Sequence, residues 1–457
     1  MTPEETQKEL SMNGIYQVIL PSENQQEAPR TGVYNVRDYG AKTDPLLLQT
    51  EAFQKAIDAC AAAGGGTVLV PPGIYRIGTI RLRSYVTLRL ENGALLRGPD
   101  SIDDYFKYPF AWELYSHTMS LIYAVGERNI RICGEGKIDF NGIAFADTDK
   151  LCIGDDVPES LRSDAHYEMP GRDFRPNRLV FFSRCEEIEI SGVTFVDSPT
   201  WTLVFDRCSN LRLHDFQVRN NMRIPNSDGI HCCGCRDVLI RGCLFECGDD
   251  CIAVTSISRE TEVNENILIS DCIFRSASAA IRIGFQGGKI RNVLIQNCII
   301  RDSNRGIAVF AGKGGWVENV SIDSVVIETR IYAGSWWGKG EPMTVCSSEE
   351  SATIRNLSLR NAVIRSENGF VVSCVNGSVS NLVLENLNME IGYGTRRPWF
   401  GRTIDLAPNP SKEAPDPARH IPWLWSEGNA GLCFRNISVQ RRPGEKIPFD
   451  EKEWILK

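Results

Sequence analysis

The chain has 457 residues, of which 42% are hydrophobic and 24% charged, so it has ample material for a large core and the composition of an ordinary globular protein. Its net charge of −8 argues against nucleic acid or an acidic membrane as the main partner, and it fits poorly with gripping a strongly anionic polymer. No apolar run reaches the roughly 18 residues of a membrane-spanning helix.

Residues 1–30 are interpreted as an N-terminal extension. The segment is polar and acidic at its start and lacks the apolar stretch of a signal peptide. The chain has sixteen cysteines, and without an export signal they favour reduced, buried thiols. The sequence therefore predicts a cytoplasmic protein, with a mature fragment of a secreted precursor as the alternative.

The first regular element in chain order is a helix that begins after Gln49 and ends at the run Gly64–Gly66. Its apolar face would contain Phe53, Ile57 and Cys60. Two segments with the alternation of strands follow it, GTVLVPPGIYRIG and VTLRLENGALLRG. Because a solenoid exposes its core at an open end, we expect this helix to cap the first coil.

A phrase of alternating aliphatic residues, split by a short polar pair, recurs from residue 187 onward. Its copies start at residues 187, 210, 237, 266, 292, 319, 356 and 381. Spacings of this size mark a repeat protein, and each unit is too short for strands plus a helix of three turns. Leucine-rich repeats share the period but have another consensus, and propeller blades are longer. The repeat predicts an all-β chain folded as a single-stranded, right-handed parallel β-helix with an N-terminal capping helix.

The repeat also predicts how the chain is divided. Residues 31–445 form the β-helix domain and residues 446–457 a C-terminal tail. Cys243, Cys272 and Cys298 fall at the same point of successive repeats, as an interior ladder requires. Residues 143–177 and 395–428 break the repeat and are interpreted as long loops beside the solenoid. Three tryptophans of the second loop are expected to pack there: Trp399, Trp423 and Trp425.

Two acidic motifs lie one coil apart in the middle of the repeats. PNSDGIH contains Asp228, and ECGDDCIAV contains Asp249 and Asp250. Adjacent coils are about 4.8 Å apart, so the three carboxylates should cluster on one outer face, if the strand ends or bulges at Gly248. One of them should keep its proton near neutral pH and serve as an acid, while another activates water, as in glycoside hydrolysis. A solvated acidic turn and a calcium site are the alternatives.

The densest cysteine cluster is HCCGC, residues 231–235. A zinc site is one interpretation, but these cysteines lack the usual partner spacing of zinc ligands. We interpret them as core residues of stacked strands and expect neither a metal nor a cofactor.

These motifs are similar to those of family 28 of the glycoside hydrolases, the polygalacturonase family. The resemblance runs from about residue 33 to the last coils, through YNVRDYGAK, AIDACAAAGGGTVLVPPGIYRIG and SGVTFVDSPTWTLVFDRCSNLRLHDF. The family's Asn-Thr-Asp motif corresponds to Asn226-Ser227-Asp228, and its Gly-Asp-Asp motif to Gly248-Asp249-Asp250. The resemblance implies a pectin lyase-like solenoid and an inverting mechanism. It also implies that Asp249 is the general acid and that Asp228 and Asp250 position and deprotonate the attacking water.

The chain departs from the family at two further motifs. Ser278–Ala280 stands where the family has Gly-His-Gly, and Ala308–Phe310 where it has Arg-Ile-Lys. The cations that normally hold a uronate carboxylate are therefore absent. His231 stands where an acid usually follows Asp-Gly-Ile. Arg282 and Arg305 lie on the same coils and could partly compensate, although surface arginines are the alternative.

The remaining candidates for substrate binding are Asn226, His231 and the adjacent pair Trp336 and Trp337. Paired tryptophans suit stacking on the apolar face of a sugar, with packing under a loop as the alternative. Lys339 and Glu341 lie close enough in sequence to reach the same substrate.

The sequence thus predicts a polygalacturonase-like glycosidase of carbohydrate metabolism. Its expected partner is an oligosaccharide substrate, with an altered subsite for the sugar; nucleic acid and membranes are not expected. A polysaccharide lyase on the same fold and a carbohydrate-binding β-helix without catalysis are the alternatives. The oligomeric state stays open.

Overall fold

The computed structural model describes residues 32–108, 117–151, 162–171, 174–255, 262–285, 287–312, 314–333, 337–347, 349–392, 394 and 422–443. The predicted extension 1–30 and tail 446–457 lie outside these residues, as do Trp336 and Trp399. The described residues belong to one compact unit, Gly32–Lys457. In the described part of the chain, no helix is long and apolar enough to cross a membrane.

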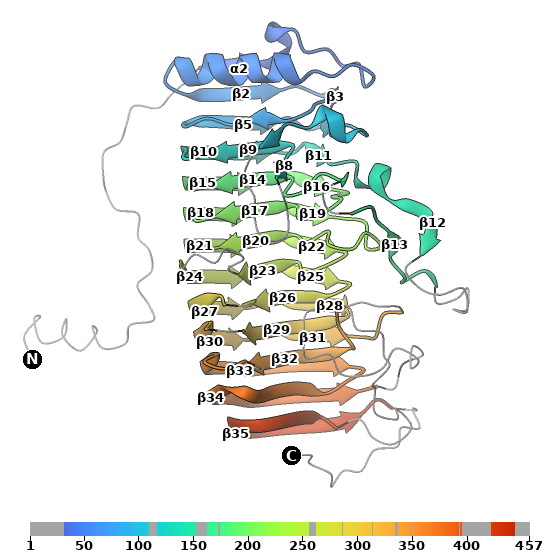
Figure 1. The fold of residues 1–457 in the computed structure, drawn as a ribbon, viewed down its shortest axis with the longest axis vertical. Helices are drawn as coiled ribbons and strands as arrows, with labels where there is room; N and C mark the ends of the chain where they lie inside the picture. Colours follow the sequence, from blue (N-terminus) through green and yellow to red (C-terminus); the bar gives the residue numbers. More distant parts are fainter. Residues whose placement is uncertain are drawn as a thin grey trace, which may run out of the picture. The chain divides into compact units, whose positions relative to one another are not determined.

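The unit is a stack of coils in which each coil contributes one strand to each of three parallel ladders (Figure 1). The first ladder begins at the N-terminal end and contains β1 (Val33–Asn35), β2 (Gly66–Val70), β5 (Val86–Leu90), β10 (Arg128–Gly134), β15 (Glu186–Ser191), β18 (Ser209–His214), β21 (Arg236–Arg241), β24 (Val263–Ser270), β27 (Lys289–Gln296) and β30 (Trp316–Asp323).

The second ladder follows around the next side of each coil. It contains β3 (Gly73–Arg76), β6 (Ala94–Arg97), β11 (Lys137–Asp139), β16 (Thr194–Val196), β19 (Gln217–Arg219), β22 (Leu244–Cys247), β25 (Ile273–Ser276), β28 (Ile299–Ser303) and β31 (Val326–Thr329).

The third ladder carries the site described below. It contains β4 (Ile80–Arg81), β9 (Ile122–Val125), β14 (Val180–Ser183), β17 (Leu203–Asp206), β20 (Ile230–Cys233), β23 (Ile252–Thr255), β26 (Ala279–Ile283), β29 (Arg305–Ala311) and β32 (Glu341–Ser347). The last coils consist of three long strands, β33 (Thr353–Ser366), β34 (Phe370–Ile391) and β35 (Leu424–Arg441). The prediction of a right-handed parallel β-helix is confirmed.

The helix α2 (Thr50–Ala62) lies over the first coil, as predicted for a cap (Figure 1). Its residues Phe53, Ile57 and Cys60 have no exposed surface, because they cover the open end of the core. Three short 3₁₀ helices complete the described helical elements: η2 (Val36–Tyr39), η3 (Ile102–Asp104) and η4 (Gly142–Phe145). Two antiparallel pairs, β7 (Lys107–Tyr108) with β8 (Thr118–Met119) and β12 (Asp147–Leu151) with β13 (Tyr167–Glu168), lie outside the three ladders.

Most copies of the repeated phrase begin with Asn for a backbone reason. Asn266, Asn292 and Asn319 all have φ between 57° and 59°, a left-handed conformation that Asn tolerates better than other residues with a side chain. Each amide also donates to the side-chain oxygen one coil earlier, at 2.9 Å for Asn266 to Asp237, 3.1 Å for Asn292 to Asn266 and 3.2 Å for Asn319 to Asn292. The Asn therefore turns the chain and stitches neighbouring coils together.

The interior is filled by side chains at equivalent positions of successive coils. Cys243, Cys272 and Cys298 are buried one above another, which confirms the predicted thiol ladder. Phe245 stacks on Phe274 with ring centroids 5.4 Å apart. Because the same residue types recur in successive coils, each repeat packs its interior side chains against matching ones in its neighbours.

Candidate active site

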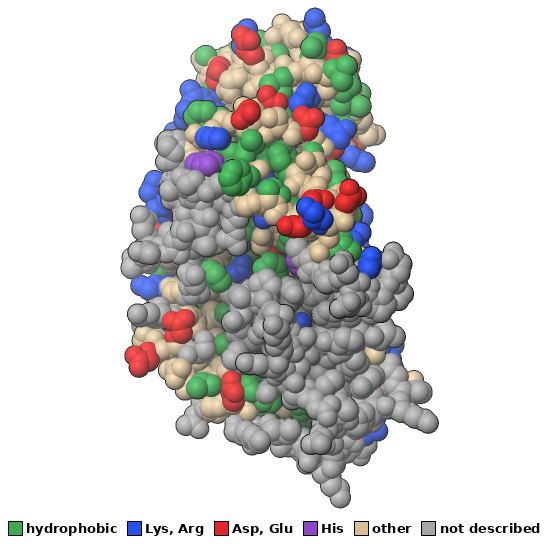
Figure 2. Space-filling model, turned by 45° about the vertical axis from the view of Figure 1, so that its right-hand side comes forward, with side chains coloured by type: hydrophobic (Ala, Val, Ile, Leu, Met, Phe, Trp, Pro, Cys, Tyr) green, Lys and Arg blue, Asp and Glu red, His purple; other side chains and the backbone are tan. Residues whose placement is uncertain are grey.

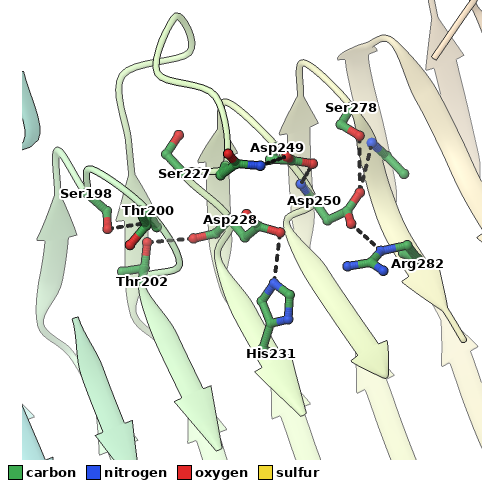
Figure 3. Close-up of polar contacts among 12 residues, drawn as sticks. Ser198, Thr200, Thr202, Ser227, Asp228, His231, Asp249, Asp250, Ser278 and Arg282 are labelled. Carbon is green, nitrogen blue, oxygen red and sulfur yellow. Dashed lines mark hydrogen bonds and ion pairs between the residues drawn. The ribbon is translucent and has the colours of Figure 1, made fainter. Parts of the chain in front are cut away.

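The three acidic residues of the two central motifs lie at the corner where the second ladder turns into the third (Figure 3). Asp228 precedes β20, and Asp249 and Asp250 precede β23. One carboxylate oxygen of each lies within 4.8 Å of the others, and all three side chains are buried. The cluster expected from the sequence is therefore present in the structure.

Glycine occurs at this corner because the backbones of adjacent coils come into close contact there. A Cβ on Gly248 would overlap the carbonyl oxygen of Ile224, and one on Gly229 would overlap that of Cys251. Ser227 ties the corners together, because its hydroxyl accepts from the Gly248 amide at 3.0 Å and donates to the Ile224 carbonyl at 2.7 Å. Glycine is needed here for proximity, and the close packing brings the carboxylates of two coils together.

Asp249 occupies the centre of the acidic cluster. Its Oδ1 accepts from the Asp250 amide at 2.9 Å, and its Oδ2 accepts from the side-chain amide of Asn226 at 3.3 Å. Burial raises the pKa of Asp249 well above its usual range, and the charges of Asp228 and Asp250 raise it further, against the opposing effect of Arg282. Its environment therefore favours the protonated form of Asp249, as a general acid requires.

Asp250 is held by a buried cation. Arg282, on β26 of the next coil, donates from Nε to Asp250 Oδ2, while the Ser278 hydroxyl and the Ala279 amide donate to Oδ1, both at 3.3 Å (Figure 3). Burial disfavours the charge of Arg282, but Asp250 and the other two acids outweigh burial and raise its pKa. The guanidinium also lies over the ring of Phe285, 5.1 Å from its centroid.

Asp228 contacts a histidine of its own coil. His231 Nε2 lies 2.8 Å from Asp228 Oδ2, and the imidazole, which has no exposed surface, stacks on Trp201 with centroids 4.0 Å apart. Burial lowers the pKa of His231 well below its usual range, and Arg282 and Arg178 lower it further, against Asp250. The ring is therefore neutral, and since a carboxylate only accepts, we assign the proton to Nε2.

One residue of this network carries no sequence signal. Arg175 is buried and donates from Nη2 to the Asn226 side-chain oxygen at 3.1 Å and from Nη1 to the Pro199 carbonyl at 2.9 Å. It thereby orients the amide that reaches Asp249. Arg175 lies 51 residues before Asn226, in the segment 143–177 predicted to be a loop, so only the folded chain identifies it.

The predicted departures form an apolar patch beside the acids. Ala279, Ala308, Phe310 and Cys346 make one buried cluster. Ala308, where the family has arginine, is the register neighbour of Arg282 on the adjacent strand. Arg282 thus stands one coil before the expected cation, on the same row of the third ladder.

The second candidate cation, Arg305, is buried beside a carboxylate of the chain. Its Nη2 lies 3.5 Å from Glu341 Oε1, and Glu341 Oε2 accepts from the Lys339 amide at 2.7 Å. The pKa of Lys339 is lowered to about 8, mainly by burial, which Glu341 opposes and Arg305 reinforces. The interpretation of Arg282 and Arg305 as surface arginines is wrong, because both side chains are buried in ion pairs.

The described tryptophans differ in their surroundings. Trp337 is partly buried and packs against the buried cluster of Ala277 and Tyr332. Trp423 contacts Phe370 and Phe434 edge-on, at centroid distances of 6.4 and 5.4 Å, in agreement with loop packing. Trp425 lies in β35 as the register neighbour of Val371, so the prediction that it belongs to a loop over residues 395–428 is wrong at this residue.

Potential metal ligands come together at one place in the residues that the structure describes. It is the cluster of Asp228, Asp249 and Asp250. Two of these carboxylates already face N–H donors, from His231 and Arg282, whereas a calcium ion takes six to eight oxygen ligands. The arrangement suits proton transfer better than cation binding. That no metal is required stays a prediction.

Comparison with known proteins gives the family. The model of glycosyl hydrolases family 28 matches residues 119–398, and a model described as rhamnogalacturonase A/epimerase, pectate lyase-like, matches residues 33–89. The chain is 28% identical to an exo-poly-alpha-D-galacturonosidase of Dickeya chrysanthemi over 56% of its own length and 48% of the relative's. It is 24% identical to a probable polygalacturonase of Vitis vinifera over 91% of this chain and 84% of the relative. The chain thus spans about half the length of the first of these relatives.

Solved structures share the fold. An exopolygalacturonase of Thermotoga maritima superposes with a TM-score of 0.65 at 21% identity, covering 81% of this chain and 89% of that one. A polygalacturonase of Erwinia carotovora gives 0.57 at 15% identity, covering 92% and 99%. At these identities the likeness demonstrates the β-helix alone. The family model covers more than half of the sequence and includes all three acidic residues, so the chain belongs to family 28 of the glycosyl hydrolases.

Proposed function

We propose that the protein is a polygalacturonase-type glycosidase that hydrolyses an oligosaccharide derived from a plant polysaccharide or a related polymer. The observation that carries this proposal is the buried acid Asp249, whose pKa is raised by burial and by two neighbouring carboxylates. A protonated carboxyl beside two others provides the acid and the base that glycoside hydrolysis requires. The matched relatives carry polygalacturonase names, which supports the same class of substrate.

Asp249 donates its proton to the glycosidic oxygen in this proposal, and water held by Asp228 and Asp250 attacks the anomeric carbon. Arg175 and Asn226 keep the carboxyl of Asp249 oriented. Water attack without a covalent intermediate inverts the anomeric configuration. The proposal of inversion rests on the family resemblance and not on the carboxylate separation. Inverting enzymes usually hold acid and base roughly 6.5–9.5 Å apart, whereas the nearest oxygens here lie within 4.8 Å.

Proton NMR of the first-formed product tests the stereochemistry. We expect the anomer opposite to that of the cleaved bond to appear first and then to mutarotate. A product that retains the configuration would instead fit the short separation of the carboxylates, and it would replace direct water attack by a covalent glycosyl-enzyme on one of the aspartates.

The sugar unit next to the cleaved bond is proposed to differ from plain galacturonate. A carboxylate taken out of water needs a paired cation, and leaving it unpaired costs several kcal/mol. Ala308 and Phe310 present a methyl group and a ring where the family has cations, while Arg282 and Arg305 already face carboxylates of the chain. An apolar surface suits a neutral sugar, a deoxy sugar or a decorated residue.

The charge distribution on the described surface agrees with weak binding of polyanionic substrates. Acidic and basic side chains are interspersed on the face that comes forward in Figure 2, without an extended basic strip over the part of it that is described. Initial rates on galacturonate oligomers and on neutral or deoxy-sugar oligosaccharides of the same length test the subsite. We expect the second group to be cleaved faster.

A charge-neutral double variant, Arg305→Met with Glu341→Gln, is the matched control for the subsite. It removes both charges of a buried pair and so leaves neither one unpaired. We expect it to keep the preference of the wild type. Efficient cleavage of unsubstituted galacturonate by the wild type, lost selectively in this variant, would mean that Arg305 has taken over the missing cation, and the proposed neutral subsite would be abandoned.

A further inference from the structure

The row of residues at the acidic corner continues along the stack beyond the acids. The amide of Ala279 donates to Asp250, and Ala279, Arg305 and Glu341 are register neighbours on β26, β29 and β32. The strand β32 lies three coils after β23, which follows the acids, and coils about 4.8 Å apart make this about 14 Å. A sugar chain that runs along the stack from Asp249 would therefore reach Glu341 a few units from the cleaved bond.

Two cations and one carboxylate are buried together at this point of the row. Arg305 and Glu341 have no exposed surface, and Lys339 is 2% exposed. Arg305 Nη2 lies 3.5 Å from Glu341 Oε1, and Glu341 Oε2 accepts from the main-chain amide of Lys339 at 2.7 Å. Both oxygens of the carboxylate thus face groups other than the Lys339 ammonium, so the three residues carry one positive charge that they do not pair among themselves.

The ammonium group of Lys339 makes no hydrogen bond or ion pair within the part of the chain that the structure describes. Glu367, the acid of the following coil, accepts from the Ile331 amide at 2.9 Å. The Lys339 nitrogen is not one of the enclosed polar atoms that lack a hydrogen bond, so it keeps contact with solvent. Because lysine is almost never buried without a partner, we expect this ammonium to meet an anion from outside the chain.

We infer that Lys339 binds the carboxylate of a sugar acid a few units away from the cleaved bond. The substrate would then combine a neutral or deoxy sugar beside the acids with a uronate unit further along. This inference rests on the function proposed above and deepens it, because it names the chemical class that a second subsite takes. A partly desolvated ammonium that forms a charge-assisted hydrogen bond to a carboxylate regains what burial has cost it.

The surroundings of Lys339 suit a sugar acid better than a small inorganic anion. One unpaired positive charge matches one carboxylate, whereas phosphate prefers several cations or a helix N-terminus. The neighbouring Arg305 guanidinium lies 5.8 Å from the centroid of the Phe310 ring. Phe310 belongs to the apolar cluster with Ala279 and Ala308, on the strands between the acids and β32. That apolar stretch fits the neutral part of an oligosaccharide whose charged unit reaches Lys339.

Thermal unfolding tests whether Lys339 is kept for binding or for stability. Its pKa of about 8 in the folded protein is below the ordinary 10.5, so the ionised side chain destabilises the folded state at neutral pH, and this cost disappears as the pH rises through both values. Arg305, Glu341 and Glu367 are the charged groups of the adjacent coils. Lys339→Met should therefore unfold at a higher temperature than the wild type at pH 7, with a smaller difference at pH 10.5. A lysine with a structural role would lose stability instead.

Kinetics on two matched oligosaccharides test the subsite itself. Both have a neutral unit at the cleaved bond, and one has a uronate a few units away whose carboxyl group is reduced to an alcohol in the other. The wild type should show a KM about 10- to 100-fold lower for the carboxylated probe, the weight of a hydrogen bond between charged groups. Lys339→Met should raise that KM to the value for the reduced probe at unchanged kcat, as expected for loss of uniform binding.

Two further variants complete the comparison. Lys339→Arg keeps the charge and should retain part of the preference for the carboxylated probe. Lys137→Met, at an exposed position of β11, is the matched control and should change neither KM. Equal KM values for the two probes in the wild type, or a preference that survives in folded Lys339→Met, would overturn the inference. Competition by free galacturonate and acetate alike, without any preference between the oligosaccharides, would mean that Lys339 holds a free anion, and the sugar-acid subsite would be wrong.

Failure of this inference is distinguishable from failure of the proposed function. A wild type that hydrolyses both probes without distinguishing them would overturn the subsite alone. A wild type that releases no sugar from any oligosaccharide would overturn the glycosidase proposal. In that case calorimetry with the same two probes still tests Lys339, because preferential binding of the carboxylated probe, lost in Lys339→Met, does not require turnover.

Discussion

Asp249→Asn should keep the fold and hydrolyse its substrate about 10² to 10⁴ times more slowly than the wild type, the usual contribution of general acid catalysis. The asparagine has nearly the same shape, and its one amide oxygen can still accept from the Asp250 amide, although its NH2 group cannot accept from Asn226 as Oδ2 does. The corner of the coil should therefore be largely preserved. It has no acidic proton to give to the leaving oxygen. Turnover measured by product analysis decides the question, and a variant with near-normal turnover would remove Asp249 from the mechanism.

The pH dependence of the same variant gives a second measurement. Since the pKa of Asp249 is raised in the folded protein, wild-type activity should fall as the pH rises through that value, and the variant should lose this basic limb. A raised pKa also destabilises the folded state as the pH rises: the loss begins above the ordinary pKa of an unfolded aspartate and is complete above the raised pKa of the folded protein. Asp249→Asn should therefore resist thermal unfolding better than the wild type in alkaline buffer. Asp215→Asn, at the surface of β18, is the control and should change neither property.

Arg282→Ala should lower the free energy of unfolding by about 3–5 kcal/mol, the cost of breaking a buried ion pair. Arg282 and Asp250 are both nearly inaccessible to solvent, and removal of the guanidinium leaves three carboxylates together without their cation. Equilibrium denaturation gives the loss directly. Activity should fall as well, because loss of the Arg282 charge alters both the protonation of Asp249 and the geometry of the corner.

Two further variants separate pairing from packing. The double variant Arg282→Met with Asp250→Asn should regain most of the lost stability, because a buried pair can be replaced by uncharged side chains of similar volume. Arg365→Ala breaks an exposed contact with Glu390 and should cost at most about 1 kcal/mol. If Arg282→Ala proved as stable as Arg365→Ala, the ion pair with Asp250 would not be the anchor of the site.

The architecture could be predicted because every coil repeats the same local requirements. The alternation of aliphatic residues directs one face of each strand inward, and the residue that opens each phrase, most often Asn, has a positive φ, as Asn292 and Asn319 do. The capping helix was equally readable, since Phe53 and Ile57 follow helical spacing and the glycines after Ala62 end it. Such signals are short-range, so they do not depend on contacts that the sequence leaves unknown.

The acidic cluster could also be predicted, because Asp228 and Asp249 are separated by one coil. A parallel β-helix converts that separation in sequence into a few ångströms in space. The partners of these acids could not be predicted in the same way. Arg282 was a candidate for substrate binding, and its pairing with Asp250 depends on which way a long side chain turns at a buried corner.

The sequence by itself determined the coil, the cap, the thiol ladder and the location of the three carboxylates. The tertiary structure alone decided the electrostatics: which acid is most deeply buried, which faces a guanidinium and which faces a neutral imidazole. It also introduced Arg175, whose contact with Asn226 joins residues 51 positions apart. The physical reason is that periodic patterns follow from backbone geometry, whereas the pKa of Asp249 and the neutrality of His231 result from desolvation and from charges that only folding brings within reach.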